Sequence, residues 1–540
     1  MRRVPPLLYL APAAAVVVLV ALVPVGLLVA RAFADAPSGL AEVLGDPLDR
    51  AAIGNSAVQG VASAAGAVAA GYPLGIWLGR YAGWGRSAVR AVVLVPFLLP
   101  SVVMAFAVEG LFGPTGFVGL PLPALRVLGG GVGGIVIANV AFNLPIVALL
   151  TAAGVESSPA ELEEAAASLG AGPLRRFRDV WGPPSLAGAI AGGLLTFVFS
   201  ALAFAAPIVL CGARCYTIEA RIWSLDTILL QPTAAALLAF VLVVLLVAPT
   251  LAYLELARRL RRAGPRGRSV RRPVRGAGPW AITVGAMVGL GLLLAVIGAV
   301  VLRSIDPSGG SAPDLSGWTT LGAPALALRT GIPLGAAALN TVAFATASAL
   351  TALLLGVVAG FALVERPAAG RLLQLVAFVP LLLSPVVLAF ALSSVGRAVV
   401  GTEGVWALVV GSQTVLALPF ALQTLAVPLR HRPRTGREAA RVLGAGPFRA
   451  YLDADVAGVR SAVGAAALFA FAISLGEFTA TYFLTSVSAA RFATLPVLLY
   501  ELQSPGVRAF AAADALAAVL VVLSVVVLAV VGWGGRRLEL

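Results

Sequence analysis

Long apolar runs, separated by short polar segments that carry arginine, dominate the chain. A helix needs roughly 20 residues to cross about 30 Å of hydrocarbon, and the runs reach that length. They are continuous and do not alternate with a period of two, a pattern that favours helices over a β-barrel. Twelve spans are predicted, at approximately 7–30, 53–79, 89–111, 131–153, 186–210, 233–257, 280–302, 336–363, 371–395, 403–427, 461–485 and 509–533. The predicted fold class is therefore all-α and integral to the membrane, with twelve transmembrane helices.

One polar segment occurs twice. The ten residues Glu164-Ala-Ala-Ala-Ser-Leu-Gly-Ala-Gly-Pro173 return 274 positions later as Glu438-Ala-Ala-Arg-Val-Leu-Gly-Ala-Gly-Pro447, and eight of the ten are identical. The first copy lies in a polar loop at about 155–185, called loop A here, and the second in a loop at about 428–460, called loop B. The duplication extends further, since Asn55-Ser and Asn340-Thr open the second span of each half.

The duplication predicts two halves, at 1–257 and 279–540, joined by an arginine-, glycine- and proline-rich linker at 258–278. Six spans per half give both halves the same orientation in the membrane. We therefore expect two parallel six-helix repeats, related by a pseudo-two-fold axis along the membrane normal.

Composition and charge agree with a membrane protein. Of the 540 residues, 60% are hydrophobic and 11% charged, and the mean hydropathy is +0.99. All 38 basic residues other than the single histidine are arginine, because the chain contains no lysine. Their concentration in loops A and B and in the linker predicts a multi-pass plasma-membrane protein with cytoplasmic N- and C-termini. The net charge of +14 follows from this topology. No soluble domain is predicted, and nucleic acid is therefore excluded as a partner.

The two cysteines, Cys211 and Cys215, lie at the external end of the fifth span. An external disulfide and two small apolar residues at a helix end are equally compatible with this spacing. Two cysteines with no nearby histidine do not make a metal site.

The sequence of loop A predicts two short helices joined by a glycine turn. Acidic residues at 161–164 are typical of the positive end of a helix, and Gly170 and Gly172-Pro173 break that helix. Loop B repeats the helix and the turn with Gly444 and Gly446-Pro447.

Glu-Ala-Ala, three residues and then glycine is the "EAA loop" of type I ABC importer permeases, and the chain resembles a fused two-half member of that family. It is most similar to thiamine and ferric-iron importer permeases. The resemblance implies the type I permease fold, an external solute-binding protein, and two copies of a cytoplasmic ABC ATPase that dock on the loops. It assigns this coupling to Glu164, Ala165, Gly170, Glu438, Ala439 and Gly444.

The loops depart from the family pattern after the glycine, where a hydrophobic residue and Leu-Pro are expected. Loop A has Val180-Trp-Gly-Pro183, which keeps the proline, and loop B has Ala454-Asp-Val-Ala457, which keeps neither residue. We therefore expect loop B to dock with a somewhat different geometry.

The chain is not expected to be an enzyme or to hold a cofactor or metal. A P-loop needs a lysine for the nucleotide phosphates, and the chain has none. Ser-His or Cys-His catalysis would depend on His431, which lies among arginines at the border of a span. ATP and Mg²⁺ are therefore expected in the partner ATPase.

Four polar residues inside spans are candidates for the translocation path. Glu477 is the clearest, because an ionisable side chain at membrane depth is costly and indicates function. The first half has alanine in its place. Asn139, Asn143 and Gln413 add amides within spans. The alternative for all four is structural hydrogen bonding between helices.

The sequence leaves the transported solute open. Thiamine is the expected cargo, with ferric iron, another small solute or an oxyanion as alternatives. A secondary transporter of the major facilitator type also has two six-span halves. Its signature between spans two and three, Gly-x-x-x-Asp-Arg-x-Gly-Arg, is replaced here by Gly79-Arg-Tyr-Ala-Gly-Trp-Gly-Arg86, which lacks the aspartate.

Overall fold

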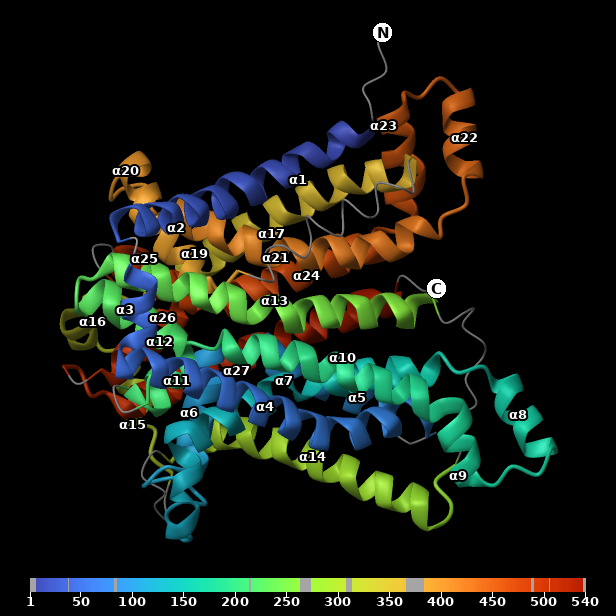
Figure 1. Cartoon of the computed structure of the whole chain (residues 1–540), viewed down its shortest axis with the longest axis horizontal. Coiled ribbons are helices and arrows are strands. Elements are labelled where there is room, and N and C mark those ends of the chain that lie inside the picture. The colour runs from blue at the N-terminus through green and yellow to red at the C-terminus, as the bar shows by residue number, and fades with distance from the viewer. Residues whose placement is uncertain are drawn as a thin grey trace.

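The structure is a computed structural model. The residues that it describes are 6–36, 38–81, 85–212, 215–262, 273–306, 313–365, 383–486, 490–504 and 506–537. Every regular element in this part of the chain is helical, which confirms the all-α fold class. The long helices run side by side as a bundle (Figure 1).

The helices of the first half are described here in chain order, η marking 3-10 and π segments. They are η1 (Pro6–Leu10), α1 (Ala11–Val16), η2 (Val17–Leu22), α2 (Val23–Asp35), α3 (Gly39–Gly45), α4 (Pro47–Arg80), α5 (Arg86–Leu98), α6 (Ser101–Phe112), η3 (Pro123–Gly129), α7 (Gly131–Glu156), α8 (Ala160–Ser168), α9 (Pro173–Arg176), η4 (Phe177–Trp181), α10 (Gly182–Ala201), α11 (Ala205–Leu210), α12 (Ile218–Trp223), η6 (Ser224–Ile228) and α13 (Pro232–Arg262).

The second half follows, and many of its helices are similar in length to their counterparts in the first half. They are α14 (Ala277–Arg303), α15 (Ser316–Leu321), α16 (Pro324–Thr330), α17 (Leu334–Glu365), α19 (Pro385–Ala391), η8 (Leu392–Gly396), α20 (Arg397–Val400), α21 (Val405–Arg430), α22 (Thr435–Val442), α23 (Pro447–Ala450), η9 (Tyr451–Val456), α24 (Arg460–Leu475), α25 (Thr479–Thr485), η10 (Ala490–Phe492), α26 (Leu495–Gln503) and α27 (Phe510–Arg537).

Eleven of the twelve predicted spans coincide with candidate membrane helices. In the described part of the chain, nine helices are long and apolar enough to cross a membrane, and two bent helix pairs bring the number to eleven. The remaining prediction, 371–395, lies partly outside the described residues, and its described part forms the shorter apolar helix Pro385–Gly396. The count of twelve therefore stays a prediction.

Besides 89–111, which divides into α5 and α6 with a bend of 103°, two spans predicted as continuous are broken in the structure. The run 186–210 forms α10, which ends at Ala201, and α11, which begins at Ala205. The run 461–485 forms α24, which ends at Leu475, and α25, which begins at Thr479. The breaks lie at matched positions of the two halves, and the second contains Glu477.

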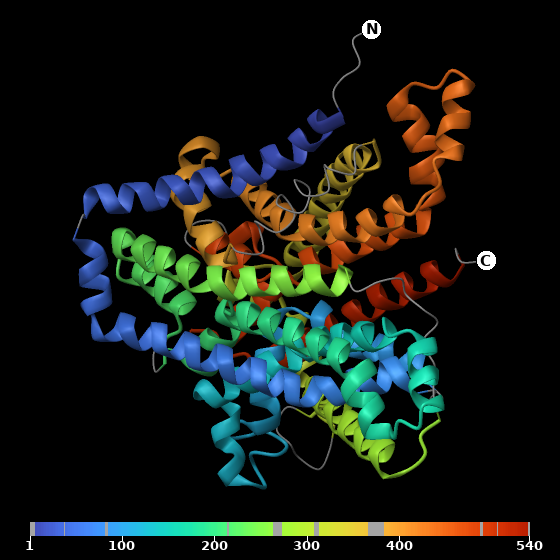
Figure 2. The ribbon, with the colours of Figure 1, turned by 45° about the vertical axis from the view of Figure 1, so that its right-hand side comes forward.

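The two halves exchange their first helices. η1 and α1 pack against α17, and η2 packs against α21, so the start of the chain lies on the second half (Figures 1 and 2). Conversely, α14 packs against α4 and α6 of the first half. The predicted boundary at 258–278 therefore divides the sequence but does not separate two independent bodies in space.

The two cysteines form a disulfide in the structure. Their Cα atoms are 5.6 Å apart, within the range that a disulfide spans. The bridge lies just after α11, at the end of the bundle opposite loops A and B (Figure 1).

Glycines at four-residue spacing bring α4 and α7 together. A Cβ added at Gly71, Gly75 or Gly79 would lie within 3.0 Å of a side-chain atom on α7. At Gly75 it would be 2.5 Å from Cβ of Thr151 and 2.6 Å from the carbonyl oxygen of Ala148. The close packing expected of small residues in membrane helices is present along this seam.

We predict that Gly75→Leu lowers the apparent melting temperature of the detergent-purified chain by several degrees, because overpacking of this kind costs about 1–3 kcal/mol. Tryptophan fluorescence during heating measures the transition. Gly54→Leu is the matched control, since a Cβ at Gly54 on the same helix has no atom within 4 Å. Equal losses for the two variants would contradict the packing account.

Candidate functional site

Loops A and B project from the same end of the bundle, which we call the loop end. α8 of loop A and α22 of loop B lie there, at the right of Figure 1. η1, where the described chain begins, also lies toward this end (Figure 1). Two matched protrusions on one face suit a partner with matching two-fold symmetry.

Each loop turns at a glycine with a positive φ angle. The φ angles are 79° at Gly170 and 91° at Gly444, a conformation that glycine adopts without strain. A Cβ at either position would meet no atom within 4 Å. The backbone conformation, and not crowding, therefore demands glycine. The turns also leave the preceding residues, Leu169 and Leu443, 88% and 87% exposed.

The six predicted coupling residues lie on the exposed side of the two short helices and turns. They are Glu164, Ala165, Gly170, Glu438, Ala439 and Gly444. By contrast, the residue before each Glu-Ala-Ala motif is buried: Glu163 is 5% exposed and Arg437 is 5% exposed. The residue before each motif therefore faces the bundle, and the motif faces outward.

A buried ion pair fixes loop A to the end of α4. Nη1 and Nη2 of Arg80 donate to the two carboxylate oxygens of Glu163 at 3.0 and 2.6 Å. The indole ring of Trp181 lies 4.2 Å from the guanidinium carbon of Arg80, a favourable cation–π distance. Arg176 lies 3.8 Å from the same carboxylate. Burial raises the pKa of the neighbouring Tyr81 phenol, which therefore stays neutral near neutral pH.

Ion pairs also fix loop B, to the end of α17. Nη1 of Arg437 donates to Asp455 at 3.0 Å, and its Nε lies 3.6 Å from the carboxylate of Glu365. Arg441 donates to Glu365 at 2.5 Å. Charged groups are costly to bury unless they are paired, so these pairs fix where α22 lies.

Arg80 and Glu365 are site residues that were not predicted from the sequence. Each is the charged residue at the end of its long apolar helix. The only signal in the sequence is that a residue of opposite charge precedes the Glu-Ala-Ala motif of the same half. The spacing of residues along the chain does not show that the end of the long helix and the residue before the motif lie close together.

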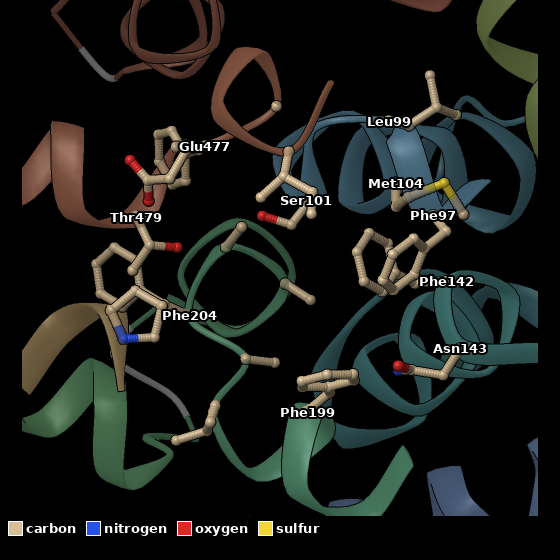
Figure 3. A pocket seen from close by; sticks show the side chains of 18 of the residues that line it. Phe97, Leu99, Ser101, Met104, Phe142, Asn143, Phe199, Phe204, Glu477 and Thr479 are labelled. Atoms are coloured by element: carbon tan, nitrogen blue, oxygen red, sulfur yellow. The ribbon is translucent and has the colours of Figure 1, made fainter. Parts of the chain in front are cut away.

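A cavity of about 240 Å³ is lined by residues of both halves (Figure 3). Six phenylalanine side chains contribute to its wall: Phe97, Phe142, Phe199, Phe204, Phe420 and Phe478. Its polar lining comprises Ser101, Asn139, Asn143, Glu477 and Thr479. The part of the lining that the structure describes contains no arginine. The cavity is thus aromatic, with one carboxylate.

The Glu477 carboxylate both lines the cavity and caps α25. It accepts hydrogen bonds from the backbone N–H groups of Ala480 and Thr481, at 2.7 and 3.0 Å, and from the Thr481 hydroxyl at 2.7 Å. The first N–H groups of a helix need such acceptors. The cap stabilises the start of α25, whereas the matched break between α10 and α11 has Ala203 at this position. Glu477 lies in the lining of the cavity beside Thr479 (Figure 3).

The three amide candidates separate into two groups. Asn139 and Asn143 line the cavity, and Asn139 also donates to Gln59 of α4 at 2.8 Å. Gln413 is not among the lining residues; it accepts from Ser348 at 3.3 Å and donates to Thr481 at 3.2 Å. Gln413 therefore joins helices behind the cavity wall.

Aromatic rings form a cluster that begins at the cavity wall with Phe204 and Phe478. Phe204 and Phe478 occupy matched positions of the two halves, and their rings stack with centroids 6.3 Å apart. Tyr482 stacks on Phe478 at 5.3 Å. Trp223 and Tyr500 lie 6.1 and 4.9 Å from Tyr482. These rings come partly from α12, α25 and α26, which lie toward the end opposite the loops (Figure 1).

Within the described residues, no group of three or more histidine, cysteine or acidic side chains could hold a metal ion. The arrangement offers docking surfaces at the loop end and a central cavity for a small molecule. In the part of the chain that the structure describes, it shows no cluster of the kind that performs chemistry on a substrate.

Comparison with known proteins identifies relatives. Residues 71–262 match the family model described as "Binding-protein-dependent transport system inner membrane component". A Haloferax volcanii protein named "Probable molybdenum ABC transporter permease protein" is 34% identical over 198 residues, which cover 36% of this chain and 71% of the relative. The molybdenum transport system permease protein ModB of Mycobacterium tuberculosis is 29% identical over 169 residues, 31% of this chain and 64% of that protein.

A further relative aligns along most of the chain. The thiamine transport system permease protein ThiP of Salmonella typhimurium is 25% identical over 438 residues, which cover 77% of this chain and 76% of the relative. The relatives are named as permeases of transport systems, and the major-facilitator alternative is set aside. The chain belongs to the binding-protein-dependent transport system inner membrane components and is an ABC importer permease.

Proposed function

We propose that the chain supplies both membrane halves of an ATP-driven importer and that one ABC ATPase docks on each of loops A and B. The observation that carries this proposal is the matched pair of exposed Glu-Ala-Ala helices at one end of the bundle (Figure 1). Two identical ATPase subunits would meet two nearly identical surfaces. ATP and Mg²⁺ would be bound by those subunits.

In this proposal the loop end faces the cytoplasm, and with it the N- and C-termini. An external solute-binding protein docks at the opposite end. Approach of the two ATPases on binding ATP moves α8 and α22 together and separates the rings of the aromatic cluster around Phe204 and Phe478. Release of the hydrolysis products returns the closed form. The cavity is the path between the two ends.

We propose thiamine as the cargo. Aromatic rings bind organic cations through their negative faces, and six phenylalanines line the cavity together with the Glu477 carboxylate. A doubly charged oxyanion would find no arginine in the described lining. The alignment with the Salmonella typhimurium thiamine permease, which runs along both halves of the chain, supports the same cargo.

Molybdate is the second candidate. It is favoured by the 34% identity with the Haloferax volcanii relative, which is named for molybdenum. That alignment is confined to 36% of this chain. Ferric iron, the other expectation from the sequence, stays an untested prediction.

We predict that Glu438→Ala reduces ATPase docking on loop B. The Glu438 side chain is exposed on α22, so its loss should leave the permease folded. Removing one charged interface contact costs on the order of 1–3 kcal/mol, or roughly 5- to 150-fold in affinity. Copurification of the ATPase with the tagged permease measures the loss.

Glu255→Ala is the control for this variant, because Glu255 is an exposed carboxylate near the C-terminal end of α13, outside both loops. The control should retain the ATPase. Wild-type copurification and transport in Glu438→Ala would remove this residue from the coupling surface.

We predict ATP-dependent uptake of labelled thiamine by proteoliposomes that contain the permease, its ATPase and its binding protein. Glu477→Gln should slow this uptake at least about tenfold while assembly with the ATPase is kept, since the variant loses a charge in the cavity and one acceptor for the α25 cap. Uptake is followed by filtration and scintillation counting.

Glu501→Gln is the matched control: Glu501 lies on α26 and is not among the cavity-lining residues. It should transport as the wild type does. Uptake of molybdate without uptake of thiamine would replace the cargo proposed here by the second candidate. Unchanged kinetics in Glu477→Gln would remove Glu477 from the path.

A further inference from the structure

The ion pairs that hold loops A and B occupy the same positions in the two halves but have opposite polarity. Arg80 follows Asn55 by as many residues as Glu365 follows Asn340, so the two residues end matched helices. Glu163 and Arg437 are likewise matched, because each directly precedes the Glu-Ala-Ala motif of its loop. In the first half the cation lies on the long helix and the anion on the loop, and in the second half this order is reversed.

A third matched position contacts the arginine of each pair, Arg80 in the first half and Arg437 in the second. Trp181 and Asp455 follow the Glu-Ala-Ala motifs of loops A and B by the same number of residues. In the first half the Trp181 ring lies against the guanidinium of Arg80 at 4.2 Å. In the second half the Asp455 carboxylate accepts a hydrogen bond from Arg437 at 3.0 Å. The three positions therefore form one site built with two opposite charge patterns.

Burial makes a mismatch of charges at these positions energetically costly. Arg80, Glu163, Arg437 and Asp455 are each at most 8% exposed. A buried charge without its partner is strongly destabilising, and two like charges in contact are worse. A loop placed on the other half would bring Glu163 beside Glu365, or Arg437 beside Arg80. Each loop therefore fits only its own half, although the two loops are nearly identical in sequence.

We propose that Arg80–Glu163 and Glu365–Arg437 are positioning pairs, which seat each coupling loop on its own half and carry its displacement into α4 and α17. This inference rests on the proposed ATPase coupling. α4 is one continuous helix of 34 residues. Its Gln59 accepts a hydrogen bond from Asn139 at the cavity wall. A loop that is firmly held to Arg80 thus moves a helix that reaches the cavity.

The test reverses the polarity of the first half. Arg80→Glu alone and Glu163→Arg alone place like charges together. The double variant restores an attractive pair with the polarity of the second half. All of these variants are made in an Arg176→Ala background, because Arg176 lies 3.8 Å from the Glu163 carboxylate and the matched residue of loop B is Ala450. Adding Trp181→Asp to the double variant reproduces all three residues of the second-half pattern. If the site needed these particular side chains for packing alone, neither the double nor the triple variant would recover the wild-type behaviour.

Two readouts are needed. The first is the distribution of distances between spin labels at Leu169→Cys and Leu443→Cys, the exposed loop tips, in the full chain purified without partners. The two native cysteines are paired, so they leave the added thiols as the labelling sites. The second readout is ATPase activity stimulated by the loaded binding protein in the reconstituted complex.

We expect each single variant to broaden the distance distribution and to lose about tenfold or more of the stimulated ATPase activity. The double and triple variants should recover a narrow distribution and most of the stimulation. If the single variants fail to fold, recovery of a monodisperse protein by the double variant supports the proposal equally. Glu255→Arg is the control, because it breaks the exposed pair between Glu255 and Arg258, and it should resemble the wild type.

Narrow distributions in the single variants, or a double variant no better than either single, would overturn the proposal. A different result would contradict the proposed function and leave the positioning pairs intact. If the wild-type complex shows no stimulated ATPase activity while the distances follow the expected pattern, the ion pairs position the loops but the coupling assignment is wrong.

Discussion

The contact between a guanidinium and a carboxylate at the end of a long helix determines where each coupling loop lies; both groups are buried in the first half, and Glu365 of the second half is partly buried. α8 has nine residues and α22 has eight, and helices this short are unstable by themselves. Their positions therefore depend on the buried residue that each directs into the bundle, Glu163 or Arg437, and on α22 also on the contact of Arg441 with Glu365. When that residue faces the bundle, the helical periodicity places the Glu-Ala-Ala motif, which follows it directly, on the outward side of the helix. The glycine turn then returns the chain to the next span.

Close helix packing supplies the frame for these contacts. Along the seam between α4 and α7, glycine lets the backbones approach, so that Gly75 lies against Thr151. The exchange of η1 and α1 onto α17, and of α14 onto α4, ties the halves together. A cavity between the halves is then a consequence of the pseudo-symmetry. Phe204 and Phe478, matched residues, meet at its wall.

Much of this could be predicted from the sequence. Apolar runs located eleven of the spans, and the repeated decamer located both loops with their glycine turns. The break at Glu477 was missed, because a count of apolar residues treats 461–485 as one helix and does not foresee a carboxylate that caps α25. Arg80 and Glu365 were missed because a whole span or more of the chain separates each from its partner on the loop. The cargo depends on cavity chemistry that no single motif encodes.

The central claim is that one chain presents two equivalent docking sites to two ATPase subunits. Native mass spectrometry of the complex, purified in mild detergent from its own membrane, tests this claim most directly. The account predicts one permease chain with two copies of one ABC ATPase. A permease that purifies with a single ATPase, or alone while uptake in the same membranes proceeds without ATP, would contradict it.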